Sequence, residues 1–513
     1  MLLDIFGIAA FVILFIVFSL IAYYGSRFRK GDLNKLYEWG LAGRKLGPWL
    51  AWFLIGADVF TAYTFVAVPS LAYAKGSAAF FAVPYVAIVF AIAMLTMPRL
   101  WTIAKKRGYV TASDFVRDRF NSRTLSVVVA ITGIVAILPY IALQIAGMQA
   151  VLTIMLYGTA DAATVSEIAL VISFIVLAAT TFASGLRGVT LGSVFKDVLI
   201  FLTVIAVVIA GVTAYGGFGS AFANIVSAKG AAAAAPYSSL PSAAVPGFFT
   251  LFIGSAFALY LYPHIINGSL SANNKKTLRR SLAVLPIYSI GLAFLALFGI
   301  LIYAVQPALT IVQSTGNGLL TVPALIVTLM PGWLAGICLL GVFVGGMVPA
   351  ALMAIAGANL VSRNIVKEFK PKIKPATETR IAKWVSVALK FIALGFIFLT
   401  PLTLAIQLQL LGGIIILQIL PAVFMALFTN RLDWKGVLLG WIVGIVSGIY
   451  LVILANPSGA LSVSNTASPW GAIYIGVVSV VLNIIVAVLG SLVVSWTGTF
   501  RKGLIKESEF VSA

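Results

Sequence analysis

The most informative stretch of this sequence is residues 46–73, which read LGPWLAWFLIGADVFTAYTFVAVPSLAY. It is long and apolar enough to cross a bilayer, because a membrane-spanning helix needs about 20 mostly apolar residues. Its centre nevertheless holds Gly56, Asp58 and Thr61. A charge at mid-bilayer costs about 2.5–3.5 kcal/mol on insertion scales, so Asp58 should face the protein interior. We therefore predict a membrane helix that is interrupted at half depth.

A second interruption is predicted in residues 246–268, whose last part reads YLYPHIING over 260–268. A proline inside a helix frees a backbone carbonyl, and open backbone within a membrane must line a cavity. Each interrupted helix begins a block of five predicted spans, at 48–213 and 246–428. Because five is odd, the second block has the opposite topology. Matching interruptions in two inverted blocks are typical of transporter binding sites.

The composition identifies the class of protein. The 513 residues are 61% hydrophobic and only 9% charged, with a mean hydropathy of +1.10. These values exclude a soluble enzyme, a disordered chain and a nucleic-acid binder. One cysteine, Cys338, and one histidine, His264, exclude an internal disulfide and bis-histidine haem ligation. The chain is predicted to be an all-α polytopic membrane protein, with no enzyme-sized soluble domain.

Thirteen spans are predicted, of which one precedes the two blocks and two follow them. Residues 1–47 hold the first span and a loop, 214–245 form an external loop, and 429–513 hold the last two spans and a short tail. The first span is not expected to be a cleaved signal peptide, because Asp4 precedes it without any basic residue. The predicted spans are 5–25, 48–74, 77–103, 124–156, 164–184, 189–213, 246–268, 281–306, 332–361, 381–399, 402–428, 434–455 and 471–496.

The net charge of +20 reflects 34 Lys and Arg against 14 Asp and Glu. Nearly all the basic residues lie in the loops after the odd-numbered spans and in the tail, whereas the opposite loops hold only Lys75 and Lys229. Since basic residues collect in cytoplasmic loops, we predict an external N-terminus and a cytoplasmic C-terminus in the cell membrane. The charge therefore indicates topology and not an anionic partner such as nucleic acid.

Four charged residues lie inside the predicted spans: Asp58, Lys196, Asp197 and Lys390. Asp58 is either an ion or proton site or a cap for the free N–H groups of the interrupted helix. Lys196 lies about 11 Å into its span at 1.5 Å per residue, so it is either buried or extended to the interface, as is Asp197. For Lys390 we expect the side chain to reach the interface.

Polar and aromatic side chains near both interruptions are candidates for solute binding, although ordinary packing is the alternative for the tyrosines and a structural role for the histidine. No arginine lies at mid-membrane to grip a dicarboxylate or phosphate, whereas helix N-termini suit a carboxylate. A small monocarboxylate or amino acid therefore fits best. The expected substrate-binding residues are Tyr63, Tyr140, Gln144, Tyr260, Tyr262 and His264; Gln407 and Gln409 are better explained as helix–helix hydrogen-bonding groups.

Several motifs resemble the sodium:solute symporter family. They are residues 46–73, the GLRG turn at 185–188, the PHI at 263–265, and Tyr140 with Gln144 in the fourth span. The strongest resemblance lies in residues 346–365, GMVPAALMAIAGANLVSRNI, which are similar to a segment of the monocarboxylate permease branch, the MctP-like proteins. This implies a LeuT-like 5+5 inverted repeat, with the solute between spans two, four, seven and eleven.

The resemblance also implies a sodium site formed by the carbonyls of Gly56 and Val59 together with two hydroxyls of span nine. The hydroxyl positions here are Val348 and Pro349, which offer no side-chain oxygen to a hard cation, and an acidic position of many members aligns with Ser193. Some proton-coupled LeuT-fold transporters carry a lysine on the same core helix. Our hypothesis is that protonated Lys196, near Asp58, replaces the sodium ion.

The sequence thus predicts a secondary transporter that imports a small organic solute, most favourably a monocarboxylate, coupled to H⁺ in preference to Na⁺. No cofactor is expected apart from a bound Na⁺ if sodium drives transport. The alternative is a Na⁺-coupled symporter of an amino acid such as proline or another small solute. A channel is disfavoured because polar residues cluster at mid-depth, and a membrane enzyme because no surface cluster of carboxylates or histidines is evident.

Overall fold

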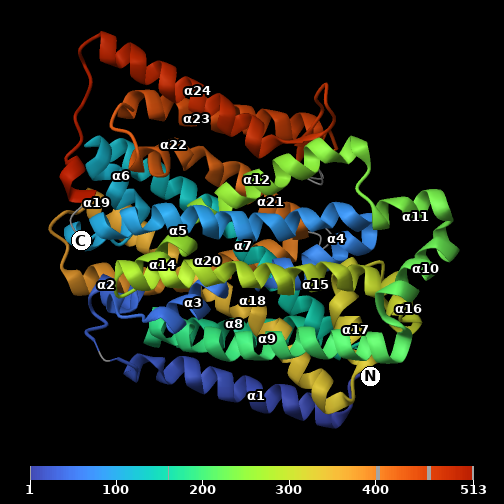
Figure 1. Ribbon diagram of the computed structural model, residues 1–513. Coiled ribbons are helices and arrows are strands. Elements are labelled where there is room, and N and C mark those ends of the chain that lie inside the picture. The colour runs from blue at the N-terminus through green and yellow to red at the C-terminus, as the bar shows by residue number, and fades with distance from the viewer. Residues whose placement is uncertain (1, 30, 160, 400–404, 459–463, 511–513) are drawn as a thin grey trace.

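The computed structural model describes residues 2–29, 31–159, 161–399, 405–458 and 464–510. In these residues the chain is helical apart from one short hairpin (Figure 1). Eleven helical segments are long and apolar enough to cross a membrane. The chain is therefore an all-α polytopic membrane protein, as predicted. Residues 402–404, the start of the predicted eleventh span, lie outside the described residues.

The first part of the chain forms an outlying helix followed by a long helical core. Helices α1 and α18 approach closely, because a Cβ on Gly336 would lie only 2.0 Å from the Gly7 carbonyl oxygen. The bounds are α1 Ile5–Tyr24, α2 Leu36–Gly40, α3 Pro48–Gly56, the π-helix η3 Tyr63–Ala67, α4 Val68–Lys75, the 3-10 helix η4 Gly76–Phe81, α5 Ala82–Arg107, α6 Ala112–Phe120, α7 Arg123–Met155, α8 Ala162–Ser184 and α9 Leu186–Tyr215.

The second part begins with two helices in the Ala-rich segment that was predicted as a loop. Its central helix, α18, belongs to the most deeply buried of the candidate spans. The bounds are α10 Gly217–Lys229, α11 Ala231–Ser238, α12 Val245–Leu261, α13 Pro263–Leu270, α14 Lys275–Val284, α15 Tyr288–Leu301, α16 Gln306–Thr315, α17 Thr321–Leu329, α18 Gly332–Leu360, α19 Lys367–Phe369, α20 Pro375–Leu399, α21 Ala405–Ile416 and α22 Leu420–Val423.

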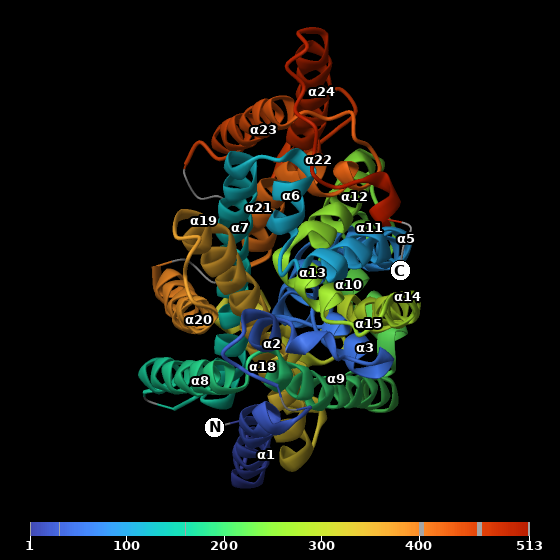
Figure 2. The same cartoon turned by 90° about the vertical axis from the view of Figure 1, so that its left-hand side faces the viewer.

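The chain ends with two packed helices, α23 Trp434–Ala455 and α24 Ile475–Trp496, joined through strands β1 Asn465–Thr466 and β2 Ile473–Tyr474. Figures 1 and 2 place α1 and the α23–α24 pair on opposite sides of the bundle. One helix before the core and two after it were predicted. Figure 1 marks the two ends of the chain at opposite ends of the bundle.

The predicted count of thirteen spans is not confirmed, for two local reasons. The span predicted at 48–74 is divided, and its second half continues through η4 into α5 as one helical run, Tyr63–Arg107. Helix α20, predicted as a span at 381–399, is not among the eleven segments. It carries Arg380, Lys383 and Lys390, so charged residues interrupt its apolar run.

Glycines allow α23 and α24 to pack at short distance, as small residues do between membrane helices. A Cβ on Gly440 would lie 2.5 Å from the Asn483 carbonyl oxygen and 2.8 Å from the Ala487 side chain, whereas a Cβ on Gly395 in α20 would meet nothing within 4 Å. The contact at Gly440 is with backbone, which cannot rotate away. The α23–α24 pair therefore requires glycine at this position.

We expect Gly440→Leu to lower the stability of the purified protein by about 1–3 kcal/mol, the usual cost of overpacking. Thermal unfolding in detergent measures this effect as a lower midpoint. Gly395→Leu is the matched control and should leave the midpoint unchanged, because its side chain enters open space. Equal midpoints for the two variants would contradict the proposed packing.

Candidate functional site

The interruption in the first core helix is present where it was predicted. Helix α3 ends at Gly56, and regular α-helix resumes only at Val68, after the π-helix η3. Backbone bonds of the ordinary helical ladder are missing in between, so carbonyl and N–H groups need other partners. Gly56 is required at the start of the break, because a Cβ there would lie 2.4 Å from the Tyr288 hydroxyl. The break is therefore packed directly against α15.

The Lys196 side chain fills the gap that the break leaves. Its ammonium donates to the carbonyl oxygens of Ala57 at 3.0 Å and Phe60 at 2.7 Å. Nζ also lies 3.0 Å from Asp197 Oδ1, and the Tyr288 hydroxyl donates to Asp197 Oδ2 at 2.7 Å. Lys196 and Asp197 are completely buried, so neither side chain extends to the interface. An unpaired ammonium would be several kcal/mol less stable there, and its three partners offset that cost.

Gln144 on α7 stabilises the C-terminal part of the break, at Ala62. Its Oε1 accepts a hydrogen bond from the Ala62 N–H at 2.9 Å, and its Nε2 donates to the Tyr140 carbonyl at 3.3 Å. Within the break, the Thr61 hydroxyl accepts from the Tyr63 N–H at 3.1 Å. Gln144 was predicted to bind solute, and the structure places it as a support for the unwound backbone.

Asp58 lies in the middle of the break with its side chain buried. Neither carboxylate oxygen has a hydrogen-bond partner among the described residues. It therefore caps none of the described N–H groups, which was one of its two predicted roles. Its charge interacts electrostatically with Lys196, Asp197 and Tyr140. A buried carboxylate that lacks donors but faces a cation is suited to accept a proton or a ligand.

The second interruption is shorter. Helix α12 ends at Leu261, Tyr262 is extended with ψ 134°, and α13 begins at Pro263. The extended backbone at Tyr262 directs its own ring and that of His264 toward Tyr140 of α7. Ring centroids are 5.2 Å apart for Tyr140–Tyr262, 5.6 Å for Tyr140–His264 and 5.2 Å for Tyr262–His264. Both breaks therefore contact α7, the first through Gln144 and the second through Tyr140.

Several polar atoms of this buried cluster have no hydrogen-bond partner among the described residues. They are the hydroxyls of Tyr63 and Tyr262 and both ring nitrogens of His264. Buried polar groups are normally paired, so these atoms are available to a bound solute. Tyr260 lies elsewhere: its hydroxyl accepts from Thr96 Oγ1 at 2.9 Å, and its ring packs 5.2 Å from Phe424. Five of the six predicted residues thus gather near the breaks.

The carbonyls predicted to bind sodium are not the carbonyls that contact the Lys196 ammonium. The Gly56 carbonyl accepts from the Val59 N–H at 2.9 Å, and the ammonium of Lys196 contacts the carbonyls one residue further on. Ser193 donates back to the Thr190 carbonyl of its own helix at 2.7 Å. Val348 and Pro349 are buried within α18 and carry no side-chain oxygen. No described group of three or more His, Cys, Asp or Glu could hold a metal ion.

Two findings at this site were not foreseen. Tyr288 fixes Asp197, and no sequence signal relates α15 to α9 at that point. Lys390 was expected to reach the interface, and that prediction is wrong, because its side chain is completely buried and donates to the Ser386 hydroxyl at 3.1 Å. Ser386 lies one turn earlier on the same helix, so α20 provides the lysine with a local partner.

Helix α2 closes the end of the bundle that carries the basic loops. Trp39 is completely buried and donates from Nε1 to the Thr181 carbonyl at 3.3 Å. Asn267 donates to the Gly40 carbonyl at 2.9 Å, and Glu38 pairs with the buried Arg187. A Cβ on Gly40 would lie 2.4 Å from Asn359. The site is therefore covered on this side by a tightly packed segment.

Comparison with known proteins places this geometry in a family. The sequence matches the family described as "Sodium:solute symporter family" over residues 39–444. It is 39% identical to the "Monocarboxylate transport permease protein" of Rhizobium johnstonii over 486 residues, covering 94% of this chain and 96% of that protein. It is 26% identical to the "Sodium/pantothenate symporter" of Escherichia coli, covering 82% of this chain and 85% of that protein.

The fold is similar to that of a solved Na⁺-coupled sialic acid symporter. The TM-score is 0.73 at 16% sequence identity, and the match covers 96% of this chain and 98% of that chain. The likeness supports a LeuT-like arrangement of the helices, with a shared architecture despite few shared residues. Together with the family match over most of the sequence, it shows that this chain belongs to the sodium:solute symporter family.

Proposed function

We propose that this symporter imports a small monocarboxylate across the cell membrane by alternating access, driven by protons. The observation that carries the proposal is the Lys196 ammonium, which occupies the break in the first core helix through the carbonyls of Ala57 and Phe60. A protonated lysine there is a cation supplied by the protein. The external N-terminus expected from the basic loops makes the end closed by α2 the cytoplasmic side.

Proton coupling follows from the partners of Lys196. With the proton bound, the ammonium holds two backbone carbonyls and pairs with Asp197. Loss of the proton removes the charge and weakens all three contacts, so the unwound segment is free to shift. Asp58 is a buried carboxylate without described donors that interacts electrostatically with Lys196, and it provides a route for the proton. Protonation of one buried lysine thereby links the inward and outward arrangements of the break.

Sodium coupling is the alternative, and the oxygen atoms available support it less well than proton coupling. Sodium prefers oxygen ligands, while Val348 and Pro349 offer none from their side chains and the Ser193 hydroxyl is bonded to Thr190. The ammonium already takes the two carbonyls of the break. Two observations favour sodium. The Asp58 oxygens have no described partner, and two similar proteins are named as sodium-coupled symporters. A Na⁺-coupled amino-acid symporter is therefore the second candidate.

The solute class follows from the donors near the two breaks. The Tyr63 and Tyr262 hydroxyls and the His264 ring provide N–H and O–H groups without described partners. These groups can hold one carboxylate, and apolar surroundings suit a short alkyl chain. The name of the Rhizobium johnstonii relative supports a monocarboxylate. Lactate, pyruvate and acetate are the solutes to test first.

The test of coupling uses purified protein in proteoliposomes, with labelled lactate, pyruvate, acetate and proline under separate Na⁺ and H⁺ gradients. We expect accumulation driven by the H⁺ gradient alone. Lys196→Ala should lose this accumulation but retain exchange of labelled for unlabelled solute, because the ammonium contacts two backbone carbonyls and Asp197 and none of the expected solute-binding side chains. Lys390→Ala, which removes the other buried membrane lysine, is the matched control and should retain both. Na⁺ stimulation in the parent that survives in Lys196→Ala would contradict the proposal.

The test of the solute site compares two tyrosines that differ in hydrogen bonding. Tyr262→Phe removes a hydroxyl without a described partner and should raise the KM for the monocarboxylate about tenfold or more, since a hydrogen bond to a charged group contributes about 1.5–3 kcal/mol. Tyr260→Phe removes a hydroxyl that is bound to Thr96 and should leave KM unchanged. Initial rates of uptake measure both. A larger effect in Tyr260→Phe would place the solute elsewhere.

A further inference from the structure

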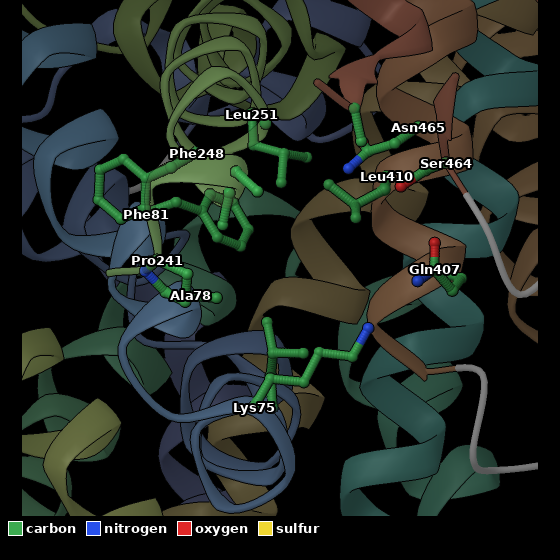
Figure 3. Close-up of a pocket in the computed structure, with 15 residues that line it drawn as sticks. Lys75, Ala78, Phe81, Pro241, Phe248, Leu251, Gln407, Leu410, Ser464 and Asn465 are labelled. Carbon is green, nitrogen blue, oxygen red and sulfur yellow. The ribbon is translucent and has the colours of Figure 1, made fainter. Parts of the chain in front are cut away.

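A cavity of about 460 Å³ opens at the end of the bundle opposite the basic loops. It lies between α4, η4, the start of α12, α21 and the hairpin strand β1 (Figure 3). Its walls are largely apolar, with Leu71, Phe81, Phe248 and Leu251 among the lining residues. The cavity opens toward the predicted external side, at the end of the bundle away from α2.

The charge in this cavity is positive. Lys75 lines it, and the described lining residues include no acidic side chain. Lys75 also forms no ion pair with any described residue. The other basic residue of the predicted external loops, Lys229, lies over the rings of Tyr237 and Tyr303 at 5.5 and 5.6 Å. Lys75 is therefore an uncompensated cation in an apolar vestibule.

Two amide side chains face the same space as Lys75. Figure 3 shows the Lys75 ammonium and the Gln407 amide nitrogen directed toward one another, with the Asn465 amide nitrogen pointing into the cavity. The oxygens Gln407 Oε1 and Asn465 Oδ1 have no hydrogen-bond partner among the described residues; they are acceptors, so a carboxylate would be held by the amide nitrogens and not by these atoms. An ammonium and two amide N–H groups around one cavity are the donors that a carboxylate requires.

The cavity adjoins the buried cluster between the two breaks. Phe81 lines the cavity, and Tyr85, four residues further along, lies with its ring centroid 6.5 Å from that of Tyr63. Leu410 also lines the cavity, and its carbonyl accepts from the Tyr474 hydroxyl at 2.6 Å. About one helical turn, 5.4 Å along the axis, separates Phe81 from Tyr85, and the Tyr85 ring in turn faces that of Tyr63 in the proposed solute site.

We infer that this cavity is an outer capture site, in which Lys75, Gln407 and Asn465 bind the carboxylate of a small monocarboxylate before it reaches the buried site. The apolar walls contact the short alkyl chain of the solute. The inference rests on the proposed function and adds a second binding position to it. A small monocarboxylate fills only part of 460 Å³, so it stays partly hydrated and binds weakly.

A weak site of this kind affects how often solute reaches the buried site, and it does not affect the rate of the later conformational change. A single exposed cation raises the local concentration of an anion. Salt screens this attraction at distances beyond the Debye length, which is about 8 Å at physiological ionic strength. Removal of the charge should therefore raise KM and leave kcat unchanged. The difference between the charged and uncharged forms should diminish as the ionic strength rises.

The experiment measures initial rates of lactate uptake in proteoliposomes for wild type, Lys75→Gln and Lys229→Gln. We expect Lys75→Gln to raise KM roughly threefold to tenfold at low salt with unchanged kcat, and Lys229→Gln, the matched control, to behave like wild type. The increase should shrink in high salt. An unchanged KM in Lys75→Gln, or an equal change in Lys229→Gln, would overturn the inference.

Chemical modification provides a second measurement. Lys75→Cys should show the raised KM, and external treatment with a cationic methanethiosulfonate should restore the wild-type value, while an anionic reagent should raise KM further. The native Cys338 is completely buried, so treated wild type is the control. Equal effects of both reagents would overturn the inference. If wild type takes up none of lactate, pyruvate and acetate, the proposed function fails first; if it does and Lys75 is without effect, only the capture site fails.

Discussion

An interrupted helix inside a membrane exposes carbonyl oxygens that water cannot reach, and in this protein one ammonium satisfies two of them. Lys196 donates to Ala57 and Phe60 across the break. The arrangement is stable only because Asp197 neutralises the charge and Tyr288 orients the carboxylate. Three helices, α3, α9 and α15, are thereby tied to one point at half depth.

The two ends of the bundle differ in how they are closed. At the basic end, α2 inserts Trp39 among the core helices and Gly40 allows the contact with Asn359. At the other end, Lys75 lies in an open vestibule. The two ends of the bundle therefore differ in what lies over the core: the packed segment α2 at one end and the cavity lined by Lys75 at the other. A carrier requires one-sided access in each of its states, so the packing of α2 is as important as the break itself.

The sequence predicted both interruptions, and the structure confirms that α3 ends at Gly56 and α12 at Leu261. Pro263 and the mid-span charge of Asp58 indicate the interruptions, and both can be recognised in the sequence without knowledge of the packing. The burial of Lys196 was left open, because depth along a span does not say which face of a helix meets lipid. Lys390 was placed wrongly for the same reason. Tyr260 and Tyr262 are separated by one residue, yet only Tyr262 faces the cluster, since Tyr260 lies within α12 whereas Tyr262 takes the extended backbone that precedes Pro263.

Composition, hydropathy and the distribution of basic residues were sufficient to determine an all-helical membrane protein with two broken core helices. These properties depend on the transfer of each residue between water and lipid, which is local to the sequence. The partner of Lys196 in the break, the contact between Asp197 and Tyr288, and the vestibule around Lys75 were decided only by the tertiary structure. They join residues on helices distant in sequence, and the packing of backbone against backbone fixes which of those residues meet.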